Sequence, residues 1–354
     1  MADKTALTNV RVFDGVDLTG PTTVVVDGPV IGTDARGVEI LDGGGGTLLP
    51  GLFDAHVHMN APGEPAELLD HGITTALDMA CFPAEKMRSF RGMAPDIRSA
   101  GTPAIGPGGP HSHMPGMPRE AVLDGPEGAE EFVARRVADG VDYIKIVVDG
   151  DRLGQATVDA LVAAGQRSGK LTVAHAASLA SFRRAVRSGV DVVTHVPRDG
   201  VLDQETVAQM VEQGQVAVPT LAMMKAVIKG AGTEGEDYSC SRESVAALHR
   251  AGVPVLAGTD AFAGPAPVPD PVPHGTGLHH ELALLVDAGL TAAEALRAAT
   301  VLPARHFRLR DRGALTAGLR ADLLLIDGDP LTDITATRNI RRVWCAGAEH
   351  ARAH

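Results

Sequence analysis

Residues 47–59, TLLPGLFDAHVHM, stand where the character of the chain changes. From this point short apolar stretches alternate with amphipathic stretches, and most of the amphipathic stretches end in glycine, the residue favoured just beyond a helix C-terminus. Apolar strands separated by such helices predict a parallel sheet that is covered on both faces. The stretch 47–59 also places two histidines at the end of the first of these strands.

Eight segments between residues 51 and 260 have the length and composition of buried strands. They are GLFDAH (51–56), ITTALDM (73–79), DIRSAG (96–101), DYIKIVV (142–148), KLTVAH (170–175), DVVTH (191–195), QVAVPT (215–220) and VPVLAGTD (253–260). Eight strand–helix units predict a (β/α)8 TIM barrel over residues 50–310. An open doubly wound sheet is the alternative, but these units lack the GxGxxG turn that often accompanies it.

The two ends of the chain share a different pattern. Residues 1–49 contain short alternating bursts, LTNVRVF, TTVVVDG and GVEILDG, each bounded by Gly, Pro or Asp, as antiparallel strands are. Residues 311–354 return to this pattern in DRGALTAGLRADLLLIDGDPL and IRRVWCAG. Because both ends flank the barrel, we expect 1–49 and 311–354 to pair as one small β-sandwich. A proline-rich stretch at 264–277 predicts a stiff loop after the eighth strand.

Composition excludes several classes of protein. The chain of 354 residues is 44% hydrophobic, and 32 Lys and Arg against 44 Asp and Glu give a net charge of −12, so we expect neither nucleic acid nor membrane as a partner. The start, MADKTALTNVRVFDG, has no signal-peptide pattern. Three distant cysteines exclude a disulfide framework. We therefore expect a cytoplasmic protein with a small-molecule substrate, and an acidic compact barrel of this kind is also expected to form homo-oligomers.

Polar residues cluster at the carboxyl ends of the predicted strands. His56, His175 and His195 end the first, fifth and sixth strands, and Asp260 ends the eighth. His58 lies two residues beyond His56, and the period of two in an extended chain puts both on one face. In barrel enzymes the active site is built at this end. These five residues are therefore expected at the barrel mouth.

Each of these residues also has an ordinary structural explanation. An HxH pair can be a solvated strand end, a single histidine a hydrogen-bonded core residue, and Asp260 a helix cap. Lys145 is harder to explain in this way, because a lysine between Ile144 and Ile146 in a buried strand is costly unless its amine is paired or modified. Four imidazoles and a carboxylate that converge on one barrel mouth predict a divalent metal site, with zinc favoured by imidazole.

These residues, in this order, resemble the metal-dependent amidohydrolase superfamily. The likeness is carried by LLPGLFDAHVHM, the strand lysine, the two single histidines and GTDA, and it extends through GVDYIKIVV, HHELALLVDAGLTAAEALRAAT and ADLLLIDGDPL over nearly the whole chain. Within the superfamily the sequence is most similar to prolidase-like and imidazolonepropionase-related members. The lysine favours the binuclear prolidase-like branch.

The resemblance implies two divalent metal ions, with zinc first and iron, manganese or cobalt able to use the same ligands. His56, His58 and Asp260 would hold the more buried ion, and His175 and His195 the more exposed one. Lys145 would be carboxylated by carbon dioxide, and its carbamate would bridge both ions. A hydroxide bridging the metals would be the nucleophile. Asp260 would take its proton and pass it to the leaving group.

Loop residues complete the expected site. The stretch GPGGPHSHMPGMP (106–118) contains His111 and His113, one of which would contact the substrate carbonyl as relatives do; the alternative is an exposed loop histidine. His274 matches a histidine that relatives place before the eighth helix. Many relatives carry an aromatic residue two positions after the fifth-strand histidine, where this chain has Ala177. Arg183 or Arg198 could replace such an anchor for a substrate carboxylate.

We therefore predict a binuclear metal-dependent hydrolase that cleaves a C–N amide, peptide-like bond of a small molecule. The first alternative is a mononuclear deaminase, or a hydrolase of a cyclic amide, an imidazolone or a lactone; it predicts one ion and an unmodified Lys145. The second is a non-hydrolytic biosynthetic enzyme on the same scaffold, which the complete ligand set makes less favourable.

Overall fold

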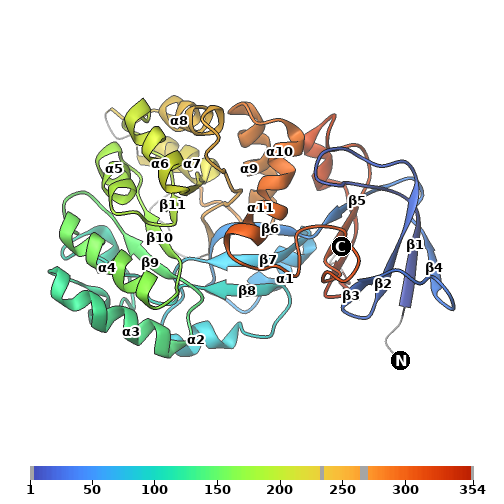
Figure 1. The fold of residues 1–354 in the computed structure, drawn as a ribbon, viewed down its shortest axis with the longest axis horizontal. Coiled ribbons are helices and arrows are strands. Elements are labelled where there is room, and N and C mark those ends of the chain that lie inside the picture. The colour runs from blue at the N-terminus through green and yellow to red at the C-terminus, as the bar shows by residue number, and fades with distance from the viewer. Residues whose placement is uncertain (1–3, 232–234, 264–269, 352–354) are drawn as a thin grey trace.

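The computed structural model describes residues 4–231, 235–263 and 270–351. In Figure 1 a sheet built from both ends of the chain lies to one side, and parallel strands with their helices lie to the other. The predicted α/β class with parallel strands is confirmed. Residues 264–269 of the predicted proline-rich loop lie outside the described residues.

The sheet at one side joins the two ends of the chain. Its strands run in the order β16-β15-β14-β5-β1-β2-β3, and β4 pairs with β1. They are β1 (Lys4–Val12), β2 (Thr22–Asp27), β3 (Val30–Gly32), β4 (Glu39–Asp42), β5 (Thr47–Pro50), β14 (Leu323–Ile326), β15 (Ile340–Cys345) and β16 (Ala348–Glu349). The antiparallel pairing of β5 with β14, in which Pro50 is opposite Leu323, connects the N-terminal strands to the C-terminal ones. Leu7, Leu48 and Trp344 pack in its hydrophobic cluster.

Two four-stranded parallel sheets form the rest of the β-structure. One has the order β13-β6-β7-β8 and the other β12-β11-β10-β9. Their strands are β6 (Leu52–His58), β7 (Ile73–Asp78), β8 (Asp96–Ser99), β9 (Ile144–Val147), β10 (Thr172–His175), β11 (Val192–Thr194), β12 (Val216–Val218) and β13 (Ala261–Phe262). Seven of the eight predicted strands are present. The eighth segment, 253–260, instead forms an isolated bridge from Val255 to Ala217, and β13 begins only after it.

Backbone hydrogen bonds link the two parallel sheets at both edges. On one side Asp142 N, two residues before β9, donates to Ser99 O of β8 at 2.9 Å, and Ala104, five residues beyond β8, forms hydrogen bonds of 2.8 Å with Lys145 O and Val147 N of β9. On the other side Leu256 N donates to Ala217 O at 2.8 Å, and Ala55 N donates to Ala257 O at 2.9 Å. The segment around residues 255–257 therefore connects β12 to β6, although it is too irregular to be a strand.

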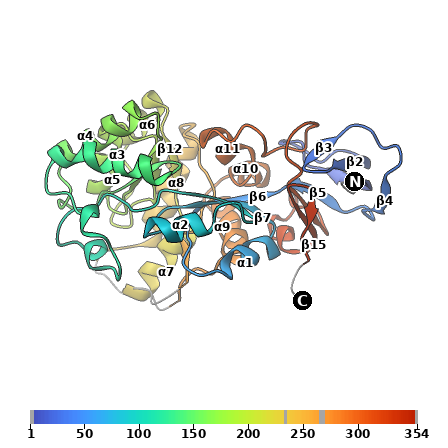
Figure 2. The same ribbon diagram turned by 90° about the horizontal axis from the view of Figure 1, so that it is seen from below.

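Helices follow the parallel strands and cover them (Figures 1 and 2). They are α1 (Glu64–Asp70), α2 (Ala84–Ser89), α3 (Ala129–Asp139), α4 (Gln155–Arg167), α5 (Leu179–Arg187), α6 (Gln204–Gln213), α7 (Leu221–Ala231), α8 (Tyr238–Arg250), α9 (Thr276–Asp287), α10 (Ala292–Ala298) and α11 (Val301–His306), with 3-10 turns η1 (Pro110–His113), η2 (Arg119–Ala121), η3 (Pro126–Gly128) and η4 (Ile334–Arg338). Gly140 and Gly214 end α3 and α6 in the left-handed conformation that glycine adopts without strain. In the described part of the chain, no helix has the length and apolar composition needed to cross a membrane.

The start of α6 leads to a prediction about stability. Asp203 caps this helix, since its Oδ1 accepts from Thr206 N at 2.8 Å, and Arg183 donates to its other oxygen. These contacts lower the pKa of Asp203 to about 2, the bond from Thr206 first. We expect Asp203→Ala to lower the free energy of unfolding by about 1 kcal/mol at neutral pH, as loss of a helix cap does.

The comparison variant Asp203→Asn keeps a side-chain oxygen for the cap but loses the charge. A carboxyl group whose pKa is depressed by folding contributes stability that is present above its unfolded pKa of roughly 4 and is lost as the pH falls toward 2. Urea unfolding between pH 7 and pH 2 should therefore show wild type and Asp203→Asn converging at the acid end. Parallel curves would contradict this account.

Candidate active site

Three predicted ligands meet where β6 ends. His56 Nε2 lies 3.2 Å and His58 Nε2 lies 3.0 Å from Oδ1 of Asp260. One potential ligand atom from each of the three residues lies within 4.8 Å of the others. Asp260 N donates to His56 O at 2.8 Å, so the backbone itself brings the end of the eighth segment against β6. Asp260 has a φ of 59°, which non-glycine residues seldom adopt and which functional sites often retain.

Asp54, which was not among the candidates from the sequence, connects the two segments that carry His56 and Asp260. Its two oxygens accept from Thr259 Oγ1 at 2.7 Å, from Thr259 N at 3.0 Å and from His56 N at 3.2 Å. The side chain is fully buried, and burial raises the pKa of Asp54 to about 7. Its position was foreseeable, because Asp54 continues the period-two face of His56 and His58 by one step.

His175 and His195 lie beside the first three residues. His195 Nε2 is 2.8 Å from His175 Nδ1, and His195 Nδ1 is 3.8 Å from Oδ2 of Asp260. The rings of His56 and His195 have centroids 4.9 Å apart. The Oγ1 of Thr220 lies 2.6 Å from His195 Nδ1. A hydrogen bond at Nδ1 leaves Nε2 as the ring nitrogen available to a metal.

The protonation states of His56, His175, His195 and Asp260 suit metal binding. For His58, burial alone would lower the pKa, but the hydrogen bond to Asp260 and the charge of Asp260 raise it above the ordinary value. Burial, followed by the charge of Lys145, lowers the pKa of His56 to about 3. Burial also holds the pKa values of His175 and His195 well below the usual range for histidine. Burial alone would raise the pKa of Asp260, but the charges of His56 and His195 and hydrogen bonds from His56 and His58 hold it well below the ordinary value. Neutral imidazoles and an ionised carboxylate are the forms that bind a cation.

Lys145 lies in β9 and is 3% exposed. Its Nζ donates to Thr194 Oγ1 at 2.8 Å, and within the described residues it forms no ion pair. Burial lowers the pKa of Lys145 to about 7, although Asp260 and Asp78 oppose the shift. A buried amine that is readily neutral and has no direct counter-ion is a reactive nucleophile.

The two loop histidines take different positions. His111 in η1 has its ring 4.8 Å, between centroids, from the ring of His175, and its Nδ1 lies 3.8 Å from Asp149 Oδ2. His113 is exposed. The structure therefore places the ring of His111 beside His175, whereas the side chain of His113 is exposed.

The other candidates from the sequence are engaged elsewhere or buried. Arg183 of α5 pairs with Asp203, the N-cap of α6, and Arg198 donates from Nε and Nη2 to Oε1 of Glu236. His274 is 5% exposed, and its Nε2 is buried with no hydrogen-bond partner among the described residues.

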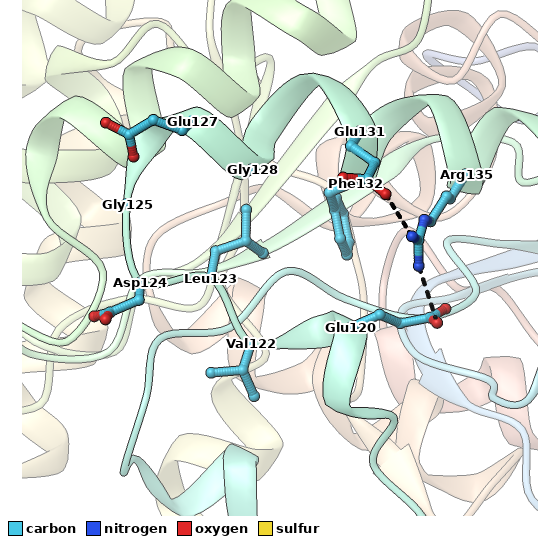
Figure 3. A pocket seen from close by; sticks show the side chains of 10 residues that line it. All are labelled: Glu120, Val122, Leu123, Asp124, Gly125, Glu127, Gly128, Glu131, Phe132 and Arg135. Carbon is cyan, nitrogen blue, oxygen red and sulfur yellow. Dashed lines mark hydrogen bonds and ion pairs between the residues drawn. The ribbon is translucent and has the colours of Figure 1, made fainter.

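Two cavities in the described part of the chain lie apart from these residues. They have volumes of about 470 and 550 Å³, and neither is lined by any of the six predicted metal ligands. Figure 3 shows the smaller one, where Arg135 forms ion pairs with Glu120 and Glu131.

The donor set fits a divalent metal, since buried imidazole nitrogens and a carboxylate oxygen converge on one point. This fit gives a prediction for Thr220, which orients His195. We expect Thr220→Val to weaken metal binding by about 10- to 100-fold, because partners that orient a ligand histidine have effects of this size. Titration against a chelator that reports free metal measures the change. Thr220→Ser keeps the hydroxyl group and should retain the affinity; equal losses in both variants would contradict the orienting role.

Comparisons with known proteins agree with this geometry. The model of the amidohydrolase family matches residues 47–349. An uncharacterised protein of Mycobacterium tuberculosis strain H37Rv is 30% identical over 346 residues, which cover 86% of this chain and 85% of that protein. Adenine deaminase 2 of Rhizobium etli is 28% identical over 344 residues, 91% of this chain but 51% of the relative, so the chain spans about half the length of that enzyme.

The fold has close structural counterparts. The crystal structure of a Xaa-Pro dipeptidase with methionine bound in its active site matches with a TM-score of 0.83 at 24% identity, and the match covers 98% of this chain and 100% of that one. At this level of identity the match shows a shared TIM-barrel-like α/β fold.

Proposed function

The chain belongs to the amidohydrolase family, and from this premise we propose that it is a binuclear metal-dependent hydrolase that cleaves a C–N amide, peptide-like bond of a small molecule. Members of the family are metal-dependent enzymes that hydrolyse bonds of this type. The observation that carries the proposal is that His56, His58 and Asp260 meet at one point, with His195 and Lys145 in the same buried group.

We infer that residues 50–310 form a closed (β/α)8 barrel and that residues 1–49 and 311–354 together form one small β-sandwich. Two sets of hydrogen bonds support closure. Leu256 N to Ala217 O and Ala55 N to Ala257 O connect β12 to β6 through residues 256–257, and Asp142 N to Ser99 O connects the start of the β9 segment to β8. The pairing of β5 with β14 supports a single terminal unit. In a closed barrel all the predicted ligands lie at the C-terminal face, where barrel enzymes carry their active sites.

The metal ligands are assigned in two groups. His56, His58 and Asp260 would hold one ion, His175 and His195 would hold the other, and Lys145 would contact both once carbon dioxide had converted its amine to a carbamate. Zinc is the metal that these ligands favour. When bound, the two ions would polarise the substrate carbonyl and make water a nucleophile near neutral pH.

The chain's own residues would orient the substrate and move the proton. Asp260 is the carboxylate among the six predicted ligands, and its depressed pKa keeps it ionised, the form that can take a proton from water and transfer it to the leaving nitrogen. His111 is the loop histidine beside the cluster, and we assign it to the substrate carbonyl. The exposed His113 is not needed for either role.

Deamination is the second candidate, because the similarity to adenine deaminase 2 covers 91% of this chain. Both reactions attack a carbon that carries nitrogen. A one-metal deaminase would leave Lys145 unmodified and would need another explanation for its burial without an ion pair. The two-metal proposal accounts for that burial directly.

The experiment measures metal content by elemental mass spectrometry together with turnover of a small panel containing dipeptides, N-acyl amino acids, a cyclic amide and adenine. We expect two ions per chain and hydrolysis of an acyclic amide. One ion together with adenine turnover would favour the deaminase. A protein that binds no metal would overturn both proposals.

We also infer a cytoplasmic location, with which the three free cysteines agree.

A further inference from the structure

A second cavity lies between α7 and α9, outside the metal cluster. It has a volume of about 550 Å³, within the range of small-molecule sites. In both ribbon views α7 and α9 run next to each other (Figures 1 and 2). The walls are largely apolar and are formed by Ala222, Ala226 and the segment Pro271–Pro273. The metal ligands contribute nothing to this lining.

Positive charge gathers around these apolar walls. Lys225, Lys229 and Arg338 line the cavity, and Asp270 is the only carboxylate among the described lining residues. Asp270 is paired with Lys229 at 2.9 Å. Within the described residues Arg338 has no ion-pair partner, and Lys225 has only the ring of Tyr238, 5.5 Å from its Nζ. Two cations that line the cavity therefore form no ion pair within the described residues, although the charge of Arg338 also acts on Asp333 at the start of η4.

Lys225 and Arg338 both interact electrostatically with His280, which also lines the cavity. Partial burial, and then the charges of Lys225 and Arg338, lower the pKa of His280. Lys225 comes from α7 and Arg338 from η4, segments more than a hundred residues apart in sequence. Their convergence on one histidine is a property of the fold and not of a local run of basic residues.

The cavity is held in shape by a buried contact on its inner side. His279, which is 1% exposed, lies with Nδ1 3.0 Å from Thr337 Oγ1 and with Nε2 3.1 Å from the carbonyl of His71. Thr337 precedes Arg338, so this contact fixes η4 against α9 and keeps Arg338 at the cavity. The backbone N–H groups of Thr276 and Gly277 already donate within the chain, so side chains supply the free positive charge.

The smaller cavity has the opposite character, as Figure 3 shows. Four acidic residues line it, and its one cation, Arg135, is paired with two of them. Nothing in that lining favours an anion. The two cavities therefore provide an internal comparison, and only the one between α7 and α9 combines an apolar wall with unpaired positive charge.

We propose that the cavity between α7 and α9 binds a small organic anion, one with an apolar body and one or two carboxylate, sulfonate or phosphate groups. The apolar body would lie against Ala222, Ala226 and Val272, and the anionic group would contact Lys225 and Arg338. Burial of apolar surface would supply affinity, and the charge pairs would select anions over neutral molecules. This site is additional to the metal centre and independent of the reaction proposed there.

The probe is 8-anilinonaphthalene-1-sulfonate, an aromatic anion whose fluorescence rises in apolar surroundings, titrated into the metal-loaded full chain. Inorganic phosphate serves as the competitor for the charged part. We expect saturable binding of one probe per chain and displacement by phosphate. The double variant Lys225→Ala/Arg338→Ala should weaken binding by about tenfold or more, since each lost charge contact costs affinity.

Arg305→Ala is the matched control, because Arg305 on α11 is exposed, has no ion-pair partner among the described residues and does not line the cavity. It should bind the probe as wild type does. Circular dichroism and metal content establish that the variants are folded, and Lys225→Glu/Arg338→Glu should abolish binding. Absence of binding to wild type, binding that phosphate does not reduce, or equal affinity in the double variant and wild type would each overturn the proposal.

Discussion

Lys145→Ala is expected to reduce the metal content from two ions per chain to one or none and to lower kcat/KM by at least about a thousandfold. The side chain is buried in β9 with only the hydroxyl of Thr194 as a hydrogen-bond partner among the described residues. A cation in this position would repel a second positive charge at His56 or His195. Burial lowers the pKa values of these two histidines, and the charge of Lys145 lowers them further. Metal ions could therefore not bind beside an unmodified, charged lysine without a large cost.

Conversion of the amine to a carbamate removes this conflict. The ammonium first loses one proton, and the neutral amine then attacks carbon dioxide and releases a second proton, so that an anion replaces the cation. Because burial lowers the pKa of Lys145 to about 7, a substantial fraction of the amine is in the reactive neutral form at neutral pH. The alanine variant has neither the cation nor the anion, so its effect on metal content tests the bridging role and not the charge of lysine alone.

Bicarbonate provides the decisive control. Wild-type protein stripped of metal should recover two ions and activity faster when zinc is supplied with bicarbonate than without it, whereas Lys145→Ala should show no response. A variant that binds two ions, or a wild type that reloads equally well without bicarbonate, would contradict the carbamate. One ion in wild type, unaffected by Lys145→Ala, would direct attention to deaminase substrates.

The strands and most of the candidate ligands could be predicted because each depends on a short local pattern. A buried parallel strand is an apolar run, and its last residues lie at the sheet edge, so His56, His175 and His195 are positioned by the few residues around them. The eighth segment was less regular than its apolar composition suggested. Its residues pair with β12 through Leu256 and with β6 through Asp260, and the φ of 59° at Asp260 departs from extended strand geometry.

Other features depend on contacts between distant residues and could not be derived from local patterns. His111 and His113 are equivalent in the sequence, and only the packing of η1 against β10 brings one of them to His175. Arg198 was a candidate anchor for a substrate, but Glu236, which the sequence places far from it, engages two of its nitrogens.

Asp260→Asn is expected to lower kcat/KM by about 10²- to 10⁴-fold, the range that a positioned acid–base group contributes. The substitution keeps the size of the side chain. It also suits the backbone, because Asp260 has a φ of 59°, a conformation that asparagine adopts more readily than most residues. The amide oxygen can still face His56 and His58. The amide nitrogen cannot accept a proton, and the negative charge that the two imidazoles surround is lost.

Metal content separates the two roles that Asp260 has in the proposal. If the asparagine oxygen still ligates, excess zinc should restore two ions per chain while kcat stays low, because the proton can no longer pass from water to the leaving nitrogen. Substrates with a better leaving group need less protonation of that nitrogen and should therefore lose less rate. The matched variant Asp149→Asn removes a nearby carboxylate outside the ligand set and should retain both ions. Full turnover by metal-loaded Asp260→Asn would show that another group carries the proton, and His111, the histidine beside His175, would be the next to replace.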